Sequence, residues 1–290
     1  MAGIIDLIGN TPMVELKKLN PNPNVTIYAK LEGNNPGGSV KDRASLNMIR
    51  SALERGDIKP GTKLIEATSG NTGIALAMIS ALFGLEIELA LPSNSTRERT
   101  LAMEAFGAKV VLLDGIEACR DYAEAKAATG EYFLLNQFAN PDNYLAHVKT
   151  TGPEIWRDTE GKITHFVSAM GTTGTIMGCS RYFKEVNPNI RIVGCQPTEG
   201  SSIPGIRRWP EAYLPKIFDP KWVDEVKDVT QEEATETARK LAKVEGIFAG
   251  MSSGGAAAAA IRLAGELKEG VIVFICCDRG DRYLSSNLFG

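Results

Sequence analysis

The chain has 290 residues, of which 43% are hydrophobic and 23% are charged, and its formal net charge is -3 at pH 7. This length accommodates two modest domains or one large one, and the composition is typical of a soluble globular enzyme. The slightly acidic balance predicts no basic surface for nucleic acid. The first residues lack the pattern of a signal peptide, and the apolar runs are too short to span a bilayer, so no membrane partner is expected.

Five cysteines and two histidines are scattered along the chain. The cysteine count is odd and no CxxC pair occurs, so neither a disulfide framework nor a metal site is predicted. Reduced thiols in the cytoplasm fit this pattern best. Cys276 and Cys277 close an apolar run and are expected to be buried strand residues rather than nucleophiles.

The predicted elements alternate between strand and helix along the chain. The first series has strands at 63–67, 86–91, 110–113 and 133–135 and helices at 73–83, 97–106 and 117–128. Ser95 and Glu98 predict a capping box for the second of these helices. The second series has strands at 165–169, 190–195, 223–229 and 271–276 and helices at 175–185, 231–245 and 254–267. This alternation predicts parallel sheets covered by helices, and turn residues at 140–143 place the division between two units within 136–152.

Ligands of open α/β sheets bind beside helix amino termini, so the loops that enter helices are the candidate sites. In the first such loop, NNPGGSVKDR at 34–43, Ser39 and Asp42 predict a capping box that places Lys41 in the first helical turn. The positive end of a helix disfavours a cation and lowers its pKa, as a Schiff-base lysine requires. Taken alone, the segment fits an exposed, solvated lysine better.

Three further helix starts are rich in glycine and hydroxyl groups: TSGNTG at 68–73, GTTGT at 171–175 and GMSSGGAAAAA at 250–260. Backbone N–H groups and hydroxyls at a helix amino terminus form an anion-binding geometry. GTTGT lacks the lysine of a P-loop and the third glycine of a dinucleotide fingerprint, which favours a phosphate that is not part of a nucleotide. Each loop alone also fits an ordinary glycine-rich turn.

Together, these segments resemble the cysteine synthase family of fold-type II pyridoxal phosphate (PLP) enzymes, and its B-type branch in particular. The resemblance covers nearly the whole chain through IGNTP, KLEGNNPGGSVKDR, EATSGNTGIALA, TTGPEIW, SAMGTTGTIMG, EGSSIPGIRRWP, FAGMSSGGA and DRGDRYLS. It implies two doubly wound α/β domains with mostly parallel sheets, similar to the β-subunit of tryptophan synthase. The smaller domain would comprise residues 35–145 and the larger one residues 1–34 plus 146–290, with PLP in the cleft between them.

The resemblance also implies a role for each matching residue. Lys41 would hold PLP as a Schiff base and then act as the catalytic base, Asn71 would bond the ring hydroxyl, and Ser252 would bond the pyridine nitrogen. The residues implied around the cofactor phosphate are Gly171, Thr172, Thr173, Gly174 and Thr175. Those implied for the substrate carboxylate are Thr68, Ser69, Gly70, Thr72 and Gln137.

The implied reaction is a β-replacement that converts O-acetyl-L-serine and sulfide into L-cysteine through an α-aminoacrylate. The B-type segments IRRWP and CDRGDRY suggest that Arg207 binds a larger anionic nucleophile, such as thiosulfate, which would yield S-sulfocysteine. The same arginines leave O-phosphoserine open as the donor, and Arg207 and Arg208 equally fit surface charges.

Two other classes of function stay open. One is a serine or threonine dehydratase on the same fold, which would release pyruvate and ammonia from serine. The other is a non-catalytic regulator, which the intact Lys41, Asn71 and Ser252 disfavour. The family implies a homodimer, and binding of serine acetyltransferase is left open.

Overall fold

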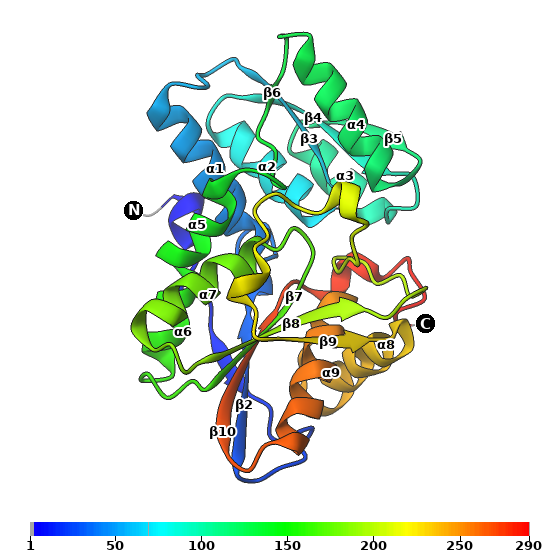
Figure 1. Cartoon of the computed structure of the whole chain (residues 1–290). Helices are drawn as coiled ribbons and strands as arrows, with labels where there is room; N and C mark the ends of the chain where they lie inside the picture. Colours follow the sequence, from blue (N-terminus) through cyan, green and yellow to red (C-terminus); the bar gives the residue numbers. More distant parts are fainter. Residues whose placement is uncertain (1–2, 69, 290) are drawn as a thin grey trace.

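The computed structural model describes residues 3–68 and 70–289. Its larger sheet has six strands in the order β1-β2-β10-β7-β8-β9 (Figure 1). Within the described residues, β1 runs antiparallel to β2 and the other neighbouring strands run parallel. The strands are β1 (Met13–Glu15), β2 (Val25–Leu31), β7 (His165–Ala169), β8 (Arg191–Pro197), β9 (Glu225–Val229) and β10 (Gly270–Cys276).

The smaller sheet has four parallel strands in the order β5-β4-β3-β6 and lies above the larger one in Figure 1. Its strands are β3 (Lys63–Ala67), β4 (Glu86–Pro92), β5 (Lys109–Leu113) and β6 (Phe133–Leu134). Two α/β units with mostly parallel sheets are therefore confirmed. The residue limits proposed for the two domains stay a prediction.

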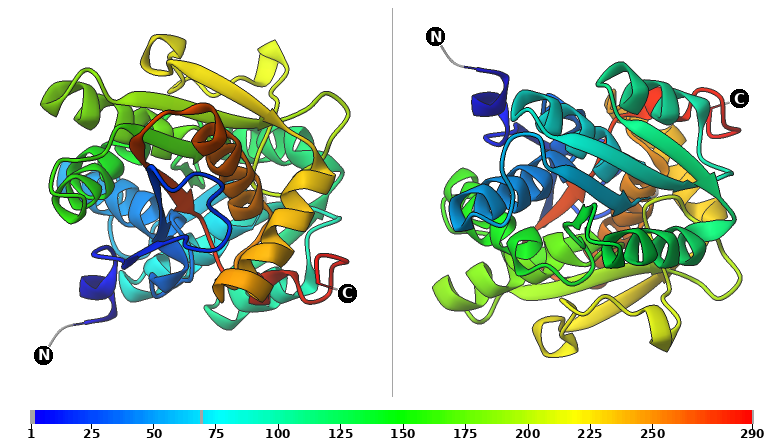
Figure 2. Two further views of the ribbon diagram at one scale, coloured as in Figure 1. Left: turned by 90° about the horizontal axis from the view of Figure 1, so that it is seen from below. Right: turned by 90° about the horizontal axis from the view of Figure 1, so that it is seen from above.

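Helices cover both faces of the six-stranded sheet (Figure 2). On one face lies α7 (Gly174–Val186), against which α5 (Pro141–Lys149) and α6 (Thr151–Asp158) pack. On the other face lies α9 (Met251–Glu266), against which α8 (Gln231–Lys240) packs. Alternation along β10 explains this arrangement, because Val273 and Ile275 join the core under α7 whereas Phe274 joins the core under α9. A strand that is buried on both faces reads as the continuous apolar run seen at 271–276.

The four-stranded sheet is also covered on both faces. Helices α1 (Lys41–Arg55), α2 (Asn71–Leu82) and α3 (Arg97–Ala105) pack on one face, and α4 (Gly115–Ala128) packs on the other. Leu64 of β3 points into the first of these cores and Ile65 into the second. Within the described residues, none of the helices is both long and apolar enough to cross a membrane.

Some sequence-based boundaries were wrong. The dividing segment 136–152 contains helix α5 and the start of α6, and Asn140 caps α5 by accepting a hydrogen bond from Asp142 N. The helix predicted at 231–245 is α-helical only to Lys240 and then continues as a π-helix over Leu241–Glu245. Helix α9 begins at Met251, three residues before the predicted start.

The capping box predicted at Ser95 and Glu98 was also wrong. Thr96 is the cap residue of α3, and its side chain makes no capping hydrogen bond. The Glu98 carboxylate instead accepts hydrogen bonds from the backbone N and the hydroxyl of Ser285 near the carboxyl terminus. A tertiary contact has replaced the local cap in this helix.

Candidate active site

A pocket lies where the amino-terminal ends of α1, α2 and α7 meet. Its lining includes seven of the residues expected from the sequence, which are Lys41, Asn71, Thr72, Gln137, Gly171, Thr172 and Arg207. These residues come from separate segments of the chain, so the structure brings the helix starts at 34–43, 68–73 and 171–175 to one cavity. Ser69 lies outside the described residues.

Lys41 is the first residue of α1. Burial lowers its pKa, while the nearby Cys277 and Asp278 act in the opposite direction. The direction agrees with the expectation for a Schiff-base lysine, and its main cause is burial rather than the helix terminus that the sequence suggests. A lowered pKa increases the fraction of neutral amine, which is the form that attacks a carbonyl or accepts a proton.

The capping box predicted for α1 was wrong. Val40 rather than Ser39 is the cap residue of the helix, and Ser39 Oγ accepts a hydrogen bond from Lys41 N at 3.2 Å rather than from Asp42 N. The Asp42 carboxylate does not reach back to Ser39 but accepts from the backbone N of Gly37. Burial raises the pKa of Asp42 to about 7. The carboxylate therefore shapes the glycine loop that leads into Lys41 rather than capping the helix.

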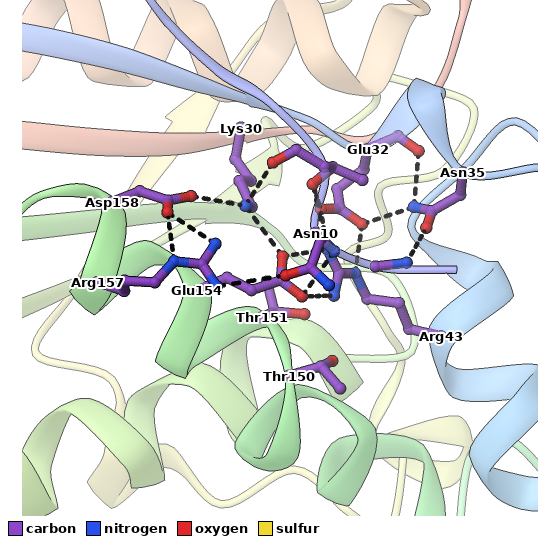
Figure 3. Close-up of polar contacts among 12 residues, drawn as sticks. Asn10, Lys30, Glu32, Asn35, Arg43, Thr150, Thr151, Glu154, Arg157 and Asp158 are labelled. Carbon is purple, nitrogen blue, oxygen red and sulfur yellow. Dashed lines mark hydrogen bonds and ion pairs between the residues drawn. The ribbon is translucent and has the colours of Figure 1, made fainter. Parts of the chain in front are cut away.

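A buried network of charges lies behind Lys41 and was not expected from the sequence (Figure 3). Arg43, two residues along α1, donates to Glu32 through Nε at 2.7 Å and to Glu154 through Nη1 at 2.7 Å. Glu154 also pairs with Lys30 at 3.0 Å, and Lys30 lies 3.3 Å from Asp158. The network thus joins the start of α1 to β2 and α6.

The ionised forms in this network stabilise one another. Burial acts to raise the pKa of Glu154, but the Arg43 guanidinium and its neighbours bring that pKa down to about 2. Arg43 likewise holds the pKa of Glu32 below its ordinary value against the effect of burial. Charges that are paired and hydrogen-bonded on several sides hold their positions, because losing one partner leaves a buried charge uncompensated. The network therefore fixes where α1, and with it Lys41, begins.

The loop before α2 is arranged around the hydroxyl of Thr68. Thr68 Oγ1 accepts hydrogen bonds from the backbone N of Gly70 and of Gly73, both at 3.1 Å. Gly70 has φ 142°, in a region that disfavours other residues, and a Cβ there would lie 2.5 Å from Arg99 Cδ. Thr72 donates its hydroxyl to Gln137 Oε1 at 2.8 Å. Thr72 and Gln137, two of the residues expected to bind a substrate carboxylate, are therefore in direct contact.

Asn71, the first residue of α2, is held by the segment that follows β10. Its Nδ2 donates to Asp278 Oδ2 at 2.7 Å, and its Oδ1 accepts from Arg282 Nη1 at 2.6 Å. Tyr283 also donates its hydroxyl to Asp278 at 2.7 Å. One hydrogen of Asn71 Nδ2 is still available for a ligand, since an amide nitrogen carries two.

The GTTGT loop has the features of a phosphate site. Thr173 adopts a left-handed conformation with φ 69°, just before α7 begins at Gly174. Among the described residues, its buried Oγ1 has no hydrogen-bond partner. The first N–H groups of α7 also lack intrahelical acceptors, and the helix dipole favours an anion there. An unpartnered hydroxyl beside free N–H groups fits the phosphate of PLP.

Ser252 lies in the first turn of α9 and is 2% exposed. It faces Gly205, which lines the pocket and has φ 90°. A Cβ on Gly205 would lie 3.1 Å from the Ser252 side chain, so a side chain at 205 would crowd this wall of the site. Among the described residues, Ser252 does not itself line the pocket, but it lies directly behind Gly205, which does.

The structure separates the two neighbouring arginines of IRRWP. Arg207 lines the pocket, and burial lowers its pKa while Glu117 opposes the shift. Arg208 is exposed and pairs with Asp228 at 2.7 Å. The surface-charge interpretation therefore holds for Arg208, and Arg207 is the arginine that a pocket ligand could reach.

The two cysteines beside the site are poor nucleophiles. Cys276 ends strand β10 and is 3% exposed, and burial raises its pKa well above the ordinary value. Burial also raises the pKa of Cys277 to about 12. The thiolate is the reactive form, so both thiols are inert near neutral pH. Cys276 is the buried strand residue that the sequence predicts, whereas Cys277 follows the strand and is half-buried.

Six further residues line the pocket and had no predicted role in it: Arg99, Ile116, Phe138, Gly205, Trp209 and Tyr283. Trp209 had been noted only as part of IRRWP, and its Nε1 donates to Gly171 O at 2.7 Å beside the phosphate loop. Phe138 packs edge-on against Trp209 with ring centroids 5.5 Å apart. Trp209 and Tyr283 belong to the segments IRRWP and CDRGDRY, whereas Arg99, Ile116 and Phe138 carry no local signal of a site, and only the tertiary fold brings them to the pocket.

Known proteins similar to this chain have the same overall organisation. The family described as pyridoxal-phosphate dependent enzymes matches residues 4–278. The chain is 58% identical to cysteine synthase B of Pseudomonas aeruginosa, over 99% of this chain and 97% of that protein. It is 43% identical to cysteine synthase A of Escherichia coli K12, over 97% and 93%. The crystal structure of cysteine synthase from Entamoeba histolytica matches with a TM-score of 0.91 and 38% identity, over 100% and 90%. The chain therefore belongs to the cysteine synthase family of pyridoxal-phosphate dependent enzymes.

Proposed function

We propose that this protein makes L-cysteine from O-acetyl-L-serine and sulfide by a PLP-dependent β-replacement. The observation that carries the proposal is the pocket in which a half-buried lysine of lowered pKa lies between two helix amino termini suited to anions. O-acetylserine has one carboxylate and PLP has one phosphate, so two anion sites on either side of one amine match the two molecules. Family membership supports the same reaction.

Lys41 would hold PLP covalently through Nζ, and the unpartnered Thr173 hydroxyl and the start of α7 would receive the phosphate. When bound, PLP supplies a conjugated ring that delocalises the electron pair left on the substrate Cα. Ser252 would face the ring nitrogen. A serine hydroxyl does not fix a proton on that nitrogen as a carboxylate would, which favours loss of a β-substituent over transamination.

Lys41 would also act as the general base for the Cα proton. The amine must be neutral to accept a proton, and burial shifts its pKa in that direction. The substrate carboxylate would lie at the loop before α2, where the first N–H groups of the helix and the second Nε2 hydrogen of Gln137 offer donors. Binding the carboxylate there orients Cα toward Lys41, which lines the same cavity.

Arg207 supports thiosulfate as a second nucleophile, with S-sulfocysteine as its product. A cation in the wall of the pocket favours a nucleophile that keeps a negative charge after its sulfur has attacked. The same charge is compatible with O-phosphoserine as an alternative donor. We also infer a homodimer in the cytoplasm, with the cofactor between the domains 35–145 and 1–34 plus 146–290.

The test is a visible spectrum combined with product analysis. The purified protein with PLP should show the absorbance band of a lysine-bound cofactor, which should shift when O-acetylserine is added and be absent from Lys41→Ala. Cysteine should form when sulfide follows. Pyruvate and ammonia from serine at comparable rates would instead identify a dehydratase, and a colourless protein after incubation with PLP would refute the proposal.

A further inference from the structure

Glu66 lies at the end of β3, directly before the loop that opens α2, and is 1% exposed. Its carboxylate accepts two consecutive backbone N–H groups from a distant turn. Oε2 accepts from Asn136 at 2.8 Å, and Oε1 accepts from Gln137 at 3.3 Å. A buried carboxylate costs free energy unless its oxygens are hydrogen-bonded, and here both oxygens are used on one turn.

The turn that Glu66 holds is an uncommon one. Asn136 adopts φ 57°, the left-handed region that most residues avoid. This conformation aims the N–H groups of Asn136 and Gln137 in the same direction, toward Glu66. The carboxylate therefore compensates for the backbone conformation and determines where the Gln137 side chain starts.

Gln137 in turn is attached to the substrate loop through its side chain. Its Nε2 donates to Ala67 O at 2.6 Å, and its Oε1 accepts from the Thr72 hydroxyl at 2.8 Å. An amide nitrogen carries two hydrogens, so one hydrogen of Nε2 is left for the pocket that Gln137 lines. The side chain can present this hydrogen in only one orientation, because both of its polar atoms are already engaged.

We propose that Glu66 is a positioning residue, which holds the 136–137 turn so that the amide of Gln137 donates to the carboxylate of the amino-acid substrate. This inference rests on the substrate position in the proposed function. Glu66 does not itself line the pocket, and it acts only through the turn and through Gln137.

The first experiment measures binding of L-serine to the PLP-loaded protein, followed by the visible spectrum of the cofactor. Burial raises the pKa of Glu66 to about 8, and Arg120 of α4 is the charged group that acts against this shift. The measurement is therefore made at about pH 9, where the carboxylate of Glu66 is ionised. In Glu66→Gln, the new amide nitrogen faces one of the two N–H donors. We expect the dissociation constant of L-serine, and the KM for O-acetylserine, to rise about tenfold while kcat stays within about twofold.

A double variant tests whether the effect passes through Gln137. Gln137→Ala removes the amide, so adding Glu66→Gln to it should weaken L-serine binding no further. Full additivity of the two effects would overturn the proposal, as would an unchanged dissociation constant in folded Glu66→Gln. If Glu66→Gln does not fold, Glu66→Asp replaces it. This change shortens the side chain by one methylene, and it should also raise the dissociation constant of L-serine.

The matched control is Glu88→Gln on the neighbouring strand β4. Glu88 is also a buried carboxylate, 2% exposed, and accepts from Lys109 and Tyr122, but it does not line the pocket. Glu88→Gln should lower the melting temperature and leave the binding of L-serine unchanged. Hydrogen exchange adds a readout that needs no substrate, since the amides of Asn136 and Gln137 should exchange faster in Glu66→Gln only. Wild-type protein that fails to bind L-serine would refute the proposed function, whereas unchanged exchange would refute the role of Glu66.

Discussion

Asn71 Nδ2 and Asp278 Oδ2 lie 2.7 Å apart and join the start of α2 to the segment that follows the last strand. Asp278 is 1% exposed, and its negative charge also acts on Lys41, where it favours the ammonium form. One carboxylate therefore serves both a residue expected to bind the cofactor ring and the residue expected to hold the cofactor. The two roles can be separated, because an amide oxygen can accept the same hydrogen bonds without the charge.

Asp278→Asn should lower the pKa of Lys41 further, because it removes a negative charge that raises it. The acidic limb of the pH profile of kcat should then move to lower pH, since kcat reports the enzyme–substrate complex, in which Lys41 would be a free amine that must be neutral to act as a base. Asp281→Asn is the control, because Asp281 pairs with Arg279 at the surface. An acidic limb that moves upward, or that moves equally in both variants, would contradict this account.

Thr173→Gly should separate stability from cofactor binding. Thr173 is β-branched and has φ 69°, so glycine should relieve strain of about 1 kcal/mol and raise the melting temperature of the cofactor-free protein. The same change removes the unpartnered hydroxyl, so we expect PLP to dissociate about tenfold more readily. Differential scanning fluorimetry without PLP and a fluorescence titration with PLP measure the two effects. If the melting temperature without PLP and the affinity for PLP both rise, or both fall, Thr173 does not contact the phosphate as proposed.

Glu154→Gln should destabilise the fold strongly. It leaves Arg43 and Lys30 short of a partner in a buried network, which costs about 3–5 kcal/mol of unfolding free energy. Glu160→Gln breaks the exposed pair with Lys162 and should leave the unfolding free energy nearly unchanged. The pKa of Glu154 is lowered to about 2, so its contribution is present above the ordinary value of 4.5 and is lost as pH falls toward 2. Urea unfolding of both variants is the measurement, and similar midpoints would contradict the role given to the network.

The repeating strand–helix pattern was enough to predict the fold class, because buried strands such as 271–276 have apolar side chains on both faces. The helix at 141–149 was missed for a physical reason. Its amphipathic pattern is short, and its first residues, Asn140 to Asn143, favour both turns and helix starts. The local sequence could not distinguish the two, and contact with α7 decided in favour of the helix.

The site could be predicted where glycine and hydroxyl residues open a helix, since that chemistry is local. Thr72 and Gly171 were found in this way. Arg43 and Glu66 were missed, because the sequence around a charged residue does not show that it will be buried. Their partners, Glu154 for Arg43 and Asn136 for Glu66, lie far away along the chain. For the same reason, the segment CDRGDRY indicated no role for Asp278 itself, and only the fold places it beside Asn71.

Glu66 should make the unfolding free energy fall as pH rises. Its ordinary pKa is 4.5, and burial raises it to about 8 in the folded protein. Between these values the folded state binds more protons than the unfolded state, so the stabilisation is complete below the lower value and is lost as pH rises through the higher one. Glu66→Gln should therefore flatten the pH dependence of the urea midpoint over this window, and parallel curves for the two proteins would show that the pKa of Glu66 is not raised.

Arg207 and Arg208 form a matched pair for testing the choice of nucleophile. Arg207→Ala should reduce kcat/KM for thiosulfate by about tenfold or more and leave the value for sulfide within about threefold, because only thiosulfate leaves a negative charge that a cation must neutralise in the pocket. Arg208→Ala removes the same charge one residue away, where it pairs with Asp228 at the surface, and should change neither value. Steady-state kinetics with both nucleophiles on both variants decides the matter. Equal losses with sulfide and thiosulfate in Arg207→Ala would show that Arg207 supports the shape of the pocket rather than the charge of the nucleophile.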